Sequence, residues 1–234
     1  MTETGTLYVV GTPLGNRDDI TLRALKTLAN AEVIMCEDTR VTSRLLGLYD
    51  DALWQALGGK PKKAHLARLD EAYESRMIAK VIDWLETGTS VSMVTDAGMP
   101  TISDPGWRVV DAVREAGFLV EVIPGPTALT TALATVGMDT SKVWFVGFLP
   151  KKPGKRASLL EEARRQLDAG ISSVVVFYES PNRLRSVLGE LTGPVAVCGE
   201  LTKTHERVIR GTVAEVLEKL PLEIKGEWVV VLGS

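Results

Sequence analysis

Cysteine and histidine are scarce in this sequence, which has only Cys36, Cys198, His65 and His205. The cysteines form no CxxC motif, and each lies in an apolar, strand-like run. This pattern favours buried free thiols in a reducing cytoplasm over a disulfide framework. The two histidines are far apart along the chain, which argues against a histidine-rich metal site. We therefore predict a cytoplasmic protein that binds no metal.

Long apolar runs and a strong net charge are also missing. No run approaches the roughly 20 residues that a membrane span needs, and the N-terminal MTETGTLYVV lacks the basic start and apolar core of a signal peptide. We expect no membrane association. The net charge of −3 is uneven, at −5 over residues 1–123 and +2 over residues 124–234. The second half is therefore the better surface for a polyanion.

The 234 residues alternate short apolar runs with helical patterns. Leu7 to Val10 and Val33 to Cys36 are typical of buried strands, and Glu74 to Glu86 is an amphipathic helix. This alternation predicts an α/β fold with a mostly parallel sheet in the first half.

The Pro124-Gly125-Pro126 stretch is a natural boundary between two parts of the chain. Strand and helix patterns continue beyond it, so we predict two α/β domains, 1–123 and 124–234. Asp50 to Lys63 has no clear pattern and contains two adjacent glycines. We predict an exposed loop there.

Glycine and proline shape three loops, Gly11–Asn16, Gly98–Ser103 and Pro124–Leu129, each directly after an apolar strand. Proline fixes φ and glycine permits positive φ, so each loop has an imposed shape. In open α/β sheets, ligands sit beyond the carboxyl ends of strands. None of the loops is a GxGxxG or GK[ST] phosphate motif. The loops therefore predict a ligand pocket, and for the first of them an ordinary tight turn is an equal alternative.

Two clusters pair acids with an arginine just after a predicted strand. They are Glu37 to Arg40 (EDTR) and Glu179 to Arg183 (ESPNR). Each combines a possible proton acceptor with a planar cation that suits phosphate. The alternative is structural, with Asp38 or Thr39 capping the helix that follows.

A third cluster is basic and lies beside proline and glycine. It places four cations within six residues, Lys151, Lys152, Lys155 and Arg156. We predict a rigid loop that contacts phosphate groups, against the alternative of a merely solvated surface.

Several motifs together carry a resemblance to one family. They are GTPLGNRDDIT at 11–21, EDTR at 37–40, TDAGMPTISDPG at 95–106, FYESPNR at 177–183 and ELTKTHERVIRGT at 200–212. PGPTAL at 124–129, GFLPKK at 147–152 and KGEWVVV at 225–231 extend the match over nearly the whole chain. In this set the chain resembles the ribosomal RNA small subunit methyltransferase I family of the tetrapyrrole methylase superfamily.

The resemblance implies S-adenosylmethionine (SAM) as the methyl donor and 2′-O-methylation of a cytidine ribose in the decoding region of 16S rRNA. It implies that the partner is 16S rRNA or the small ribosomal subunit. It also implies two α/β domains with SAM in the cleft between them, in a homodimer. Two departures from the family stand out, Met99 in place of the usual threonine and the segment Leu69 to Ser75 (LDEAYES).

The resemblance also implies a set of cofactor contacts. These are Leu14, Gly98, Thr101, Ile102, Thr127, Ala128, Phe148 and Thr202.

The chemistry needs alignment of the methyl donor and a base for the ribose hydroxyl. The acids and histidine near strand ends are candidate bases, namely Glu37, Asp38, Asp96, Asp104, Glu179 and His205. Three cations are candidates for holding phosphate, namely Arg40, Arg183 and Lys203. We assign catalysis to the two acid–arginine clusters, through Glu37, Asp38, Arg40, Glu179 and Arg183.

Two other functions stay open, a tetrapyrrole methyltransferase of the same fold and a non-catalytic assembly factor that binds RNA or SAM. The acid–arginine clusters and the basic loop favour RNA, because a tetrapyrrole pocket would not need them.

Overall fold

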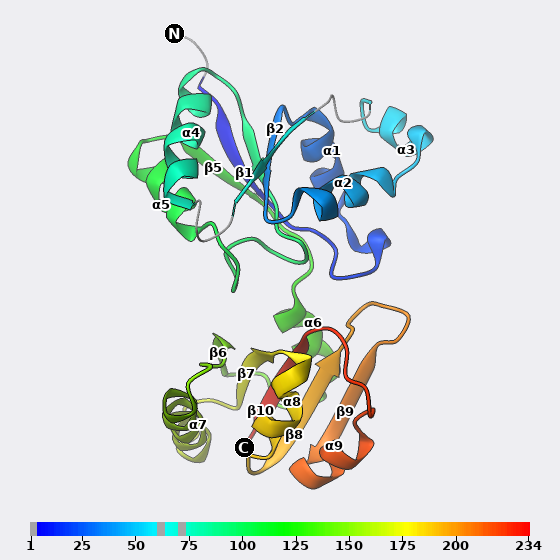
Figure 1. Cartoon of the computed structure of the whole chain (residues 1–234), viewed down its shortest axis with the longest axis vertical. Coiled ribbons are helices and arrows are strands. Elements are labelled where there is room, and N and C mark those ends of the chain that lie inside the picture. Colours follow the sequence, from blue (N-terminus) through cyan, green and yellow to red (C-terminus); the bar gives the residue numbers. More distant parts are fainter. Residues whose placement is uncertain (1–3, 60–63, 70–73) are drawn as a thin grey trace. The chain divides into compact units, whose positions relative to one another are not determined.

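A computed structural model describes residues 4–59, 64–69 and 74–234 of the chain. The contacts divide the chain into two compact units, Met1–Thr127 and Ala128–Ser234 (Figure 1). The end of the predicted loop, at 60–63, and most of the LDEAYES segment, at 70–73, lie outside the described residues.

The first unit is built on a five-stranded sheet in the order β3-β2-β4-β1-β5, and every pairing in it is parallel. The strands are β1 (Thr6–Val10), β2 (Val33–Cys36), β3 (His65–Arg68), β4 (Val91–Met93) and β5 (Leu119–Ile123). The helices are η1 (Arg17–Asp19), α1 (Leu22–Asn30), α2 (Thr39–Gly47), α3 (Asp51–Ala56), α4 (Glu74–Glu86) and α5 (Trp107–Glu115). The predicted parallel sheet is confirmed.

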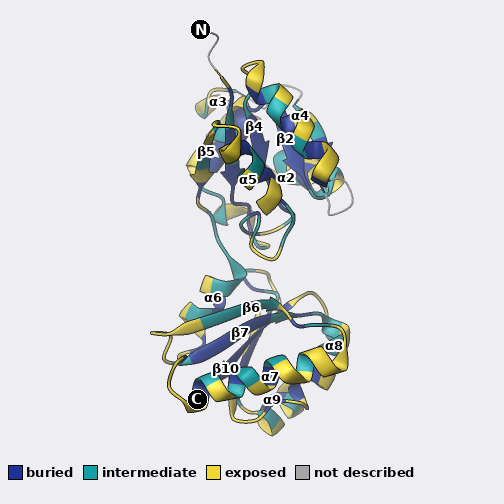
Figure 2. Cartoon of the chain, turned by 90° about the vertical axis from the view of Figure 1, so that its left-hand side faces the viewer, coloured by how far each residue is buried: buried dark blue, intermediate teal, exposed yellow. Residues whose placement is uncertain are grey.

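Helices cover both faces of this sheet, as expected for parallel strands with buried, uninterrupted apolar runs. On one face, Leu7 and Met35 pack with Val81 of α4 and Val109 of α5. On the other face, the strands pack against α1. Figure 2 shows the buried strands inside and the exposed faces of the helices outside. This core fixes where the strands end, and hence where the loops that follow them lie.

The loop predicted for Asp50 to Lys63 is wrong for residues 51–56, which form α3. The Asp50 side chain caps this helix by accepting a hydrogen bond from the Leu53 amide at 2.8 Å. Trp54 is buried, and its ring lies edge-on to Tyr49 with centroids 5.8 Å apart. A six-residue helix with one buried anchor is too short to show helical periodicity in sequence.

The second unit has a mixed sheet in the order β6-β7-β10-β8-β9, in which only the β6–β7 pairing is parallel. The strands are β6 (Val143–Phe148), β7 (Val174–Glu179), β8 (Pro194–Gly199), β9 (Arg207–Thr212) and β10 (Trp228–Gly233). The helices are α6 (Ala128–Thr135), α7 (Pro153–Asp168), α8 (Pro181–Leu188) and α9 (Val213–Lys219). A second α/β unit is therefore present, as predicted.

Helix α7 begins at Pro153, before Lys155 and Arg156, which the sequence pattern assigns to a loop. Proline is favoured in the first turn of a helix because its missing N–H has no partner there anyway. Lys155 and Arg156 therefore lie in a helical turn, and the prediction of a loop through these two residues is wrong.

No helix in the described part of the chain combines the length and apolarity that crossing a bilayer requires.

Candidate functional site

The three glycine- and proline-shaped loops come together at the carboxyl edge of the first sheet. The amide of Thr12 donates to the carbonyl of Gly98 at 2.8 Å, and the amide of Gly98 donates back to the carbonyl of Thr12 at 3.1 Å. The buried Thr12 hydroxyl also donates to the carbonyl of Thr95 at 3.1 Å. The loop after β1 is thus fastened to the loop after β4.

The loop after β5 joins them through a contact between two glycine backbones. A Cβ atom on Gly11 would lie 2.7 Å from both the Cα and the nitrogen of Gly125, and equally close to the sulfur of Met99. A Cβ atom on Gly125 would lie 2.9 Å from the Cα of Gly11. Only glycine permits this approach. The departure at Met99 is therefore part of the packing of this loop junction.

Residues 98–106 hold an unusual backbone conformation. The φ angles are positive at Gly98 (89°), Thr101 (73°), Ser103 (67°) and Gly106 (122°). Positive φ is uncommon for residues with a side chain and clusters at ligand sites when the surroundings enforce it. Ile102, between the two strained residues, is exposed. The loop thus exposes an apolar side chain, Ile102, beside a backbone of unusual shape.

Glu74, which the sequence shows only as the start of a helix, braces the end of this loop. Its buried carboxylate accepts a hydrogen bond from the amide of Gly106 at 3.1 Å and pairs with the guanidinium of Arg108 at 2.7 Å. A glutamate in the first turn of a helix usually indicates a favourable charge at the helix dipole, so sequence alone hides this second role.

Two carboxylates, Glu37 and Asp96, lie together at the ends of β2 and β4. The Thr95 hydroxyl donates to Glu37 at 3.1 Å, and the Asp38 amide donates to Asp96 at 3.2 Å. Burial and the nearby charge of Glu37 raise the pKa of Asp96 above its ordinary value, although the bond from the Asp38 amide opposes this shift. A carboxylate with a raised pKa is the better proton acceptor.

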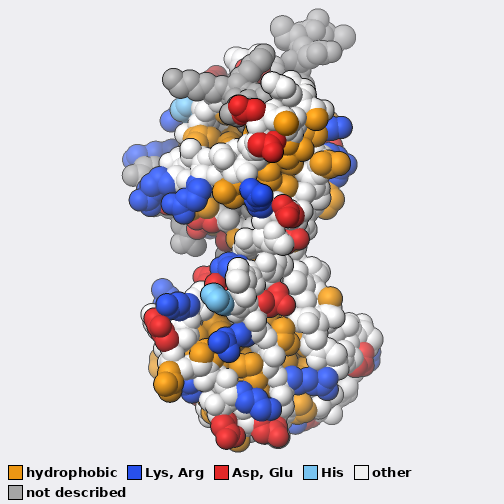
Figure 3. Space-filling view, turned by 90° about the vertical axis from the view of Figure 1, so that its right-hand side faces the viewer, with side chains coloured by type: hydrophobic (Ala, Val, Ile, Leu, Met, Phe, Trp, Pro, Cys, Tyr) orange, Lys and Arg blue, Asp and Glu red, His pale blue; other side chains and the backbone are white. Residues whose placement is uncertain are grey.

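Asp38 is engaged in structural contacts instead. Its side chain caps α2 by accepting from the Arg40 amide at 2.8 Å, and it pairs with the Arg40 guanidinium at 2.6 Å. These bonds hold the pKa of the Asp38 carboxyl well below its usual range, which makes it a weak base. The structure thus shows Asp38 as the helix cap that the sequence offers as the alternative to a catalytic role. Arg40 keeps 86% of its side chain exposed, and Figure 3 shows lysines and arginines gathered on one flank of the first unit.

Glu179 and Arg183 form an ion pair at 2.7 Å, in which the Glu179 side chain is only 2% exposed. Glu179 also accepts from the Ser180 amide at 2.8 Å, and Arg183 donates to the carbonyl of Leu149 at 3.1 Å. The pair thereby ties the segment after β6 to the end of β7. These contacts give Glu179 a structural partner and do not favour it as the proton acceptor that the sequence predicts.

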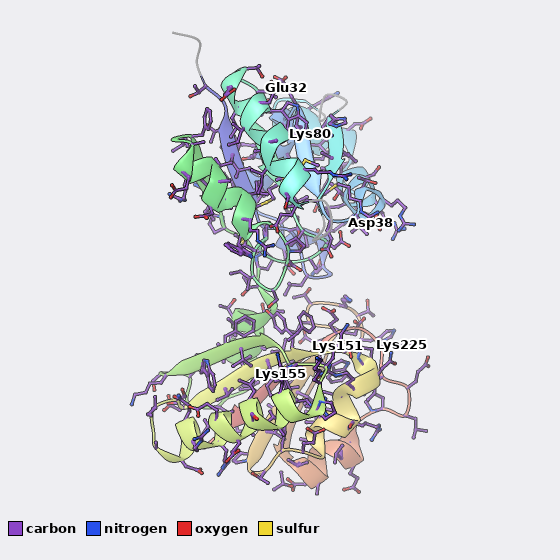
Figure 4. The ribbon with its side chains drawn as sticks, turned by 60° about the vertical axis from the view of Figure 1, so that its left-hand side comes forward. Glu32, Asp38, Lys80, Lys151, Lys155 and Lys225 are labelled. Atoms are coloured by element: carbon purple, nitrogen blue, oxygen red, sulfur yellow. The ribbon has the colours of Figure 1, made fainter. Side chains whose placement is uncertain are left out.

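The basic cluster consists of three exposed lysines and one arginine that is held in an ion pair. Lys151, Lys152 and Lys155 are exposed, and Figure 4 labels Lys151 just before α7 and Lys155 in its first turn. The Arg156 side chain is only 12% exposed and binds Glu190 through two hydrogen bonds of 2.7 and 2.9 Å. This ion pair removes Arg156 from the candidates for phosphate contact.

Three further predicted residues of the second unit, Phe148, Thr202 and Lys203, lie at or near strand ends, and Ala128 begins α6. Phe148 is exposed at the end of β6, with its ring edge-on to Tyr178. The amide of Thr202, which has a φ of 65°, donates to Glu206 at 2.6 Å. Lys203 pairs with Glu200 at 2.9 Å. Among the residues described, no three His, Cys, Asp or Glu side chains are grouped as ligands for a metal.

Comparison with known proteins gives a family match over most of the chain. The model of the Tetrapyrrole (Corrin/Porphyrin) Methylases matches residues 6–217. A ribosomal RNA small subunit methyltransferase I from Thermotoga maritima is 40% identical over 98% of this chain and 99% of its own length. One of the same name from Halalkalibacterium halodurans is 38% identical over 97% of this chain and 75% of its own length.

Solved structures show the same fold at lower identity. The methyltransferase CobJ has a TM-score of 0.68 at 18% identity and covers 99% of this chain and 95% of its own. Uroporphyrin-III C-methyltransferase from Thermus thermophilus, complexed with S-adenyl homocysteine, has a TM-score of 0.62 at 20% identity and covers 97% of each chain.

Proposed function

The chain belongs to the tetrapyrrole methylase family and, within it, to the ribosomal RNA small subunit methyltransferase I family, and on this premise we propose that it transfers a methyl group from SAM to the 2′-hydroxyl of a cytidine in the decoding region of 16S rRNA. The observation that carries the proposal is the junction of three loops beside the Glu37–Asp96 carboxylate pair. The relatives with rRNA names are about twice as identical as the neighbours with porphyrin names, which supports RNA over a tetrapyrrole.

In this proposal the loop junction binds the methyl donor. The glycine contact lets the loop backbones approach closely, and Leu14 and the exposed Ile102 provide apolar contacts for the ligand. When bound, SAM supplies an electrophilic methyl group attached to a sulfonium, and the sulfonium becomes a neutral thioether once the methyl group is transferred. Thr101 and Thr127 complete the contacts proposed in the first unit. Ala128, Phe148 and Thr202 in the second unit remain predicted contacts.

Asp96 is the proton acceptor in this proposal. The Asp96 carboxylate would accept the proton of the ribose 2′-hydroxyl as that oxygen takes up the methyl group that bound SAM would supply. Glu37 supports this step because its charge raises the pKa of Asp96. Correct placement of the hydroxyl in line with the carbon–sulfur bond supplies most of the remaining rate.

The exposed Lys151, Lys152 and Lys155 bind RNA phosphates in this proposal, with Lys203 as a further contact. The partner is 16S rRNA or the small ribosomal subunit, the protein acts in the cytoplasm, and it forms a homodimer.

The test is transfer of a tritiated methyl group from SAM to unmethylated small subunits, free 16S rRNA and a porphyrinogen. We expect label only in the RNA or the subunit. Digestion of the product to nucleosides should place the label on the ribose of a cytidine. Label in the porphyrinogen alone would establish the tetrapyrrole alternative. RNA or SAM binding without any transfer would establish the non-catalytic one.

A further inference from the structure

Helix α2 presents a second arginine, Arg44, one turn after Arg40. Residues at positions i and i+4 share a face of a helix, so the two guanidinium groups flank one strip of surface. This strip contains a hollow of about 670 Å³. Its lining consists of Thr39, Arg40, Ser43 and Arg44 from α2 and Leu66 from β3.

Each of the two arginines keeps at least one nitrogen that no acidic side chain of the described residues engages. Arg44 is exposed and has no ion-pair partner within the described ranges. Arg40 binds Asp38 through Nε and Nη2, which orients its guanidinium and leaves Nη1 for another acceptor. Thr39 and Ser43 add hydroxyl groups, each able to donate one hydrogen bond. The hollow therefore collects donors for an anion.

The hollow also lies next to the carboxylate pair of the proposed reaction. Asp38, the cap of α2, donates its amide to Asp96 and directly precedes Thr39 of the hollow. A nucleic acid strand with one ribose at Asp96 would therefore reach the first turns of α2 with an adjoining nucleotide. The hollow and the Glu37–Asp96 carboxylate pair both lie in the first unit.

We propose that this hollow is a phosphate-binding subsite for single-stranded RNA beside the methylated nucleotide. Arg44 and Arg40 bind one phosphate, because the planar guanidinium presents paired donors that match phosphate oxygens. The Thr39 and Ser43 hydroxyls donate to the same group, and Leu66 gives the sugar an apolar surface. This inference rests on the proposed function and adds an RNA contact separate from the lysines near α7.

The test compares Arg44→Ala with Arg44→Lys and with Arg114→Ala, which removes an exposed arginine from the last turn of α5. Binding of a fluorescent single-stranded fragment of the 16S rRNA decoding region is measured by anisotropy over a range of salt concentrations. Because Arg40 stays on the same phosphate, loss of Arg44 should reduce the slope of log K against log salt by at most about 0.7 and weaken binding by up to about fivefold near 0.1 M salt. The KM for RNA should rise by a similar factor with kcat unchanged.

Arg44→Lys should keep the salt slope, because it keeps the charge, and Arg114→Ala should match the wild type. An unchanged slope and KM in Arg44→Ala, in an enzyme that methylates RNA, would overturn the subsite and leave the proposed function intact. A steeper loss for Arg114→Ala than for Arg44→Ala would also overturn it. If the wild type neither binds nor methylates RNA, the proposed function fails and the subsite fails with it. SAM affinity by calorimetry should be the same in all variants.

Discussion

Asp38 and Asp96 show how two aspartates at neighbouring strand ends acquire opposite chemistry. Bonds from Arg40 lower the pKa of Asp38, whereas burial and the charge of Glu37 raise the pKa of Asp96. The residue type and the position after a strand are the same in both. The difference arises from the burial, charges and donors that each carboxylate meets, and these make Asp96 the better proton acceptor of the two.

Asp96→Asn should therefore lower turnover far more than Asp38→Asn. Loss of a general base typically costs about 10²–10⁴-fold in rate, whereas asparagine is as good a helix cap as aspartate. Single-turnover methyl transfer with tritiated SAM measures the rate, and calorimetry checks that SAM affinity is kept. A larger loss of rate in Asp38→Asn would return the role of base to Asp38.

The acid side of the pH profile offers a second prediction at this scale. Transfer needs the Asp96 carboxylate deprotonated, so kcat/KM should fall as the pH drops through its raised pKa. Glu37→Gln removes a charge that raises this pKa, so the acid limb should move to lower pH. Glu32→Gln, which changes an exposed acid just before β2, is the control. An acid limb that stays in place in Glu37→Gln would show that another group titrates.

The contact between Gly11 and Gly125 predicts a sharp response to a single methyl group. Gly11→Ala places its Cβ against backbone atoms that cannot rotate away, and overpacking of this kind costs about 1–3 kcal/mol. We expect a lower Tm and weaker SAM binding by calorimetry. Gly47→Ala is the matched control, because a Cβ there meets no atom within 4 Å. Normal SAM affinity in Gly11→Ala would remove this contact from the cofactor site.

At the scale of elements, the prediction concerns the start of α7. Replacing Lys151, Lys152 and Lys155 by alanine should weaken RNA binding and flatten its salt dependence, because fewer counterions are released. Arg156→Ala should instead lower the Tm and leave the salt slope nearly unchanged, since Arg156 binds Glu190. Lys80→Ala, on the exposed side of α4, is the control in the same anisotropy titration. Equal slopes for the triple variant and Lys80→Ala would mean that the lysines are merely solvated.

The long periodic helices and the fully buried apolar strands could be predicted from sequence, whereas short elements with a single buried residue could not. The helix from Glu74 to Glu86 repeats its apolar face over three turns, so its bounds are read correctly. Helix α3 depends on one buried tryptophan, and β3 is an edge strand whose one buried residue is Ala67. Such elements are stabilised by neighbours that are distant in sequence, which periodicity does not record.

The site was predictable in its loops and less so in its side chains. Strand ends and glycines mark where the chain must turn, and the structure brings these three loops together. Which acid has a raised pKa depends on partners from other strands, as Thr95 and Asp38 show. The Glu179–Arg183 pair looks the same in sequence as Glu37–Arg40, but its burial and its bond to Leu149 become visible only in three dimensions.

At the scale of the whole molecule, the chain has two α/β units with separate cores. Phe177 and Trp228 belong to the core of the second unit, whereas Leu7 and Val81 belong to the first. The loops Gly11–Asn16 and Gly98–Ser103 and the carboxylate pair lie in the more acidic half, residues 1–123, and the exposed lysines near α7 lie in the more basic half. In the proposals made above, carboxylates of the first unit serve proton transfer and exposed lysines of the second unit bind phosphate, while Arg40 and Arg44 add one phosphate contact to the first unit.

The nature of the acceptor tests this proposal for the molecule as a whole. If the methyl group goes to a ribose 2′-hydroxyl, an RNA fragment in which every cytidine is replaced by 2′-deoxycytidine should accept none, because the nucleophile is missing. It should still bind, because the phosphates remain. A fragment with 2′-deoxyuridine at every uridine is the matched control. It loses the 2′-hydroxyls of the other pyrimidine nucleotides and keeps those of the cytidines. We expect full methylation of the control. The dissociation constants of the two fragments, measured by anisotropy, should agree within about twofold. Label on the deoxycytidine fragment would show that the methyl group goes to an atom other than a cytidine 2′-hydroxyl and would refute the proposed cytidine ribose chemistry, whatever the identity of the proton acceptor.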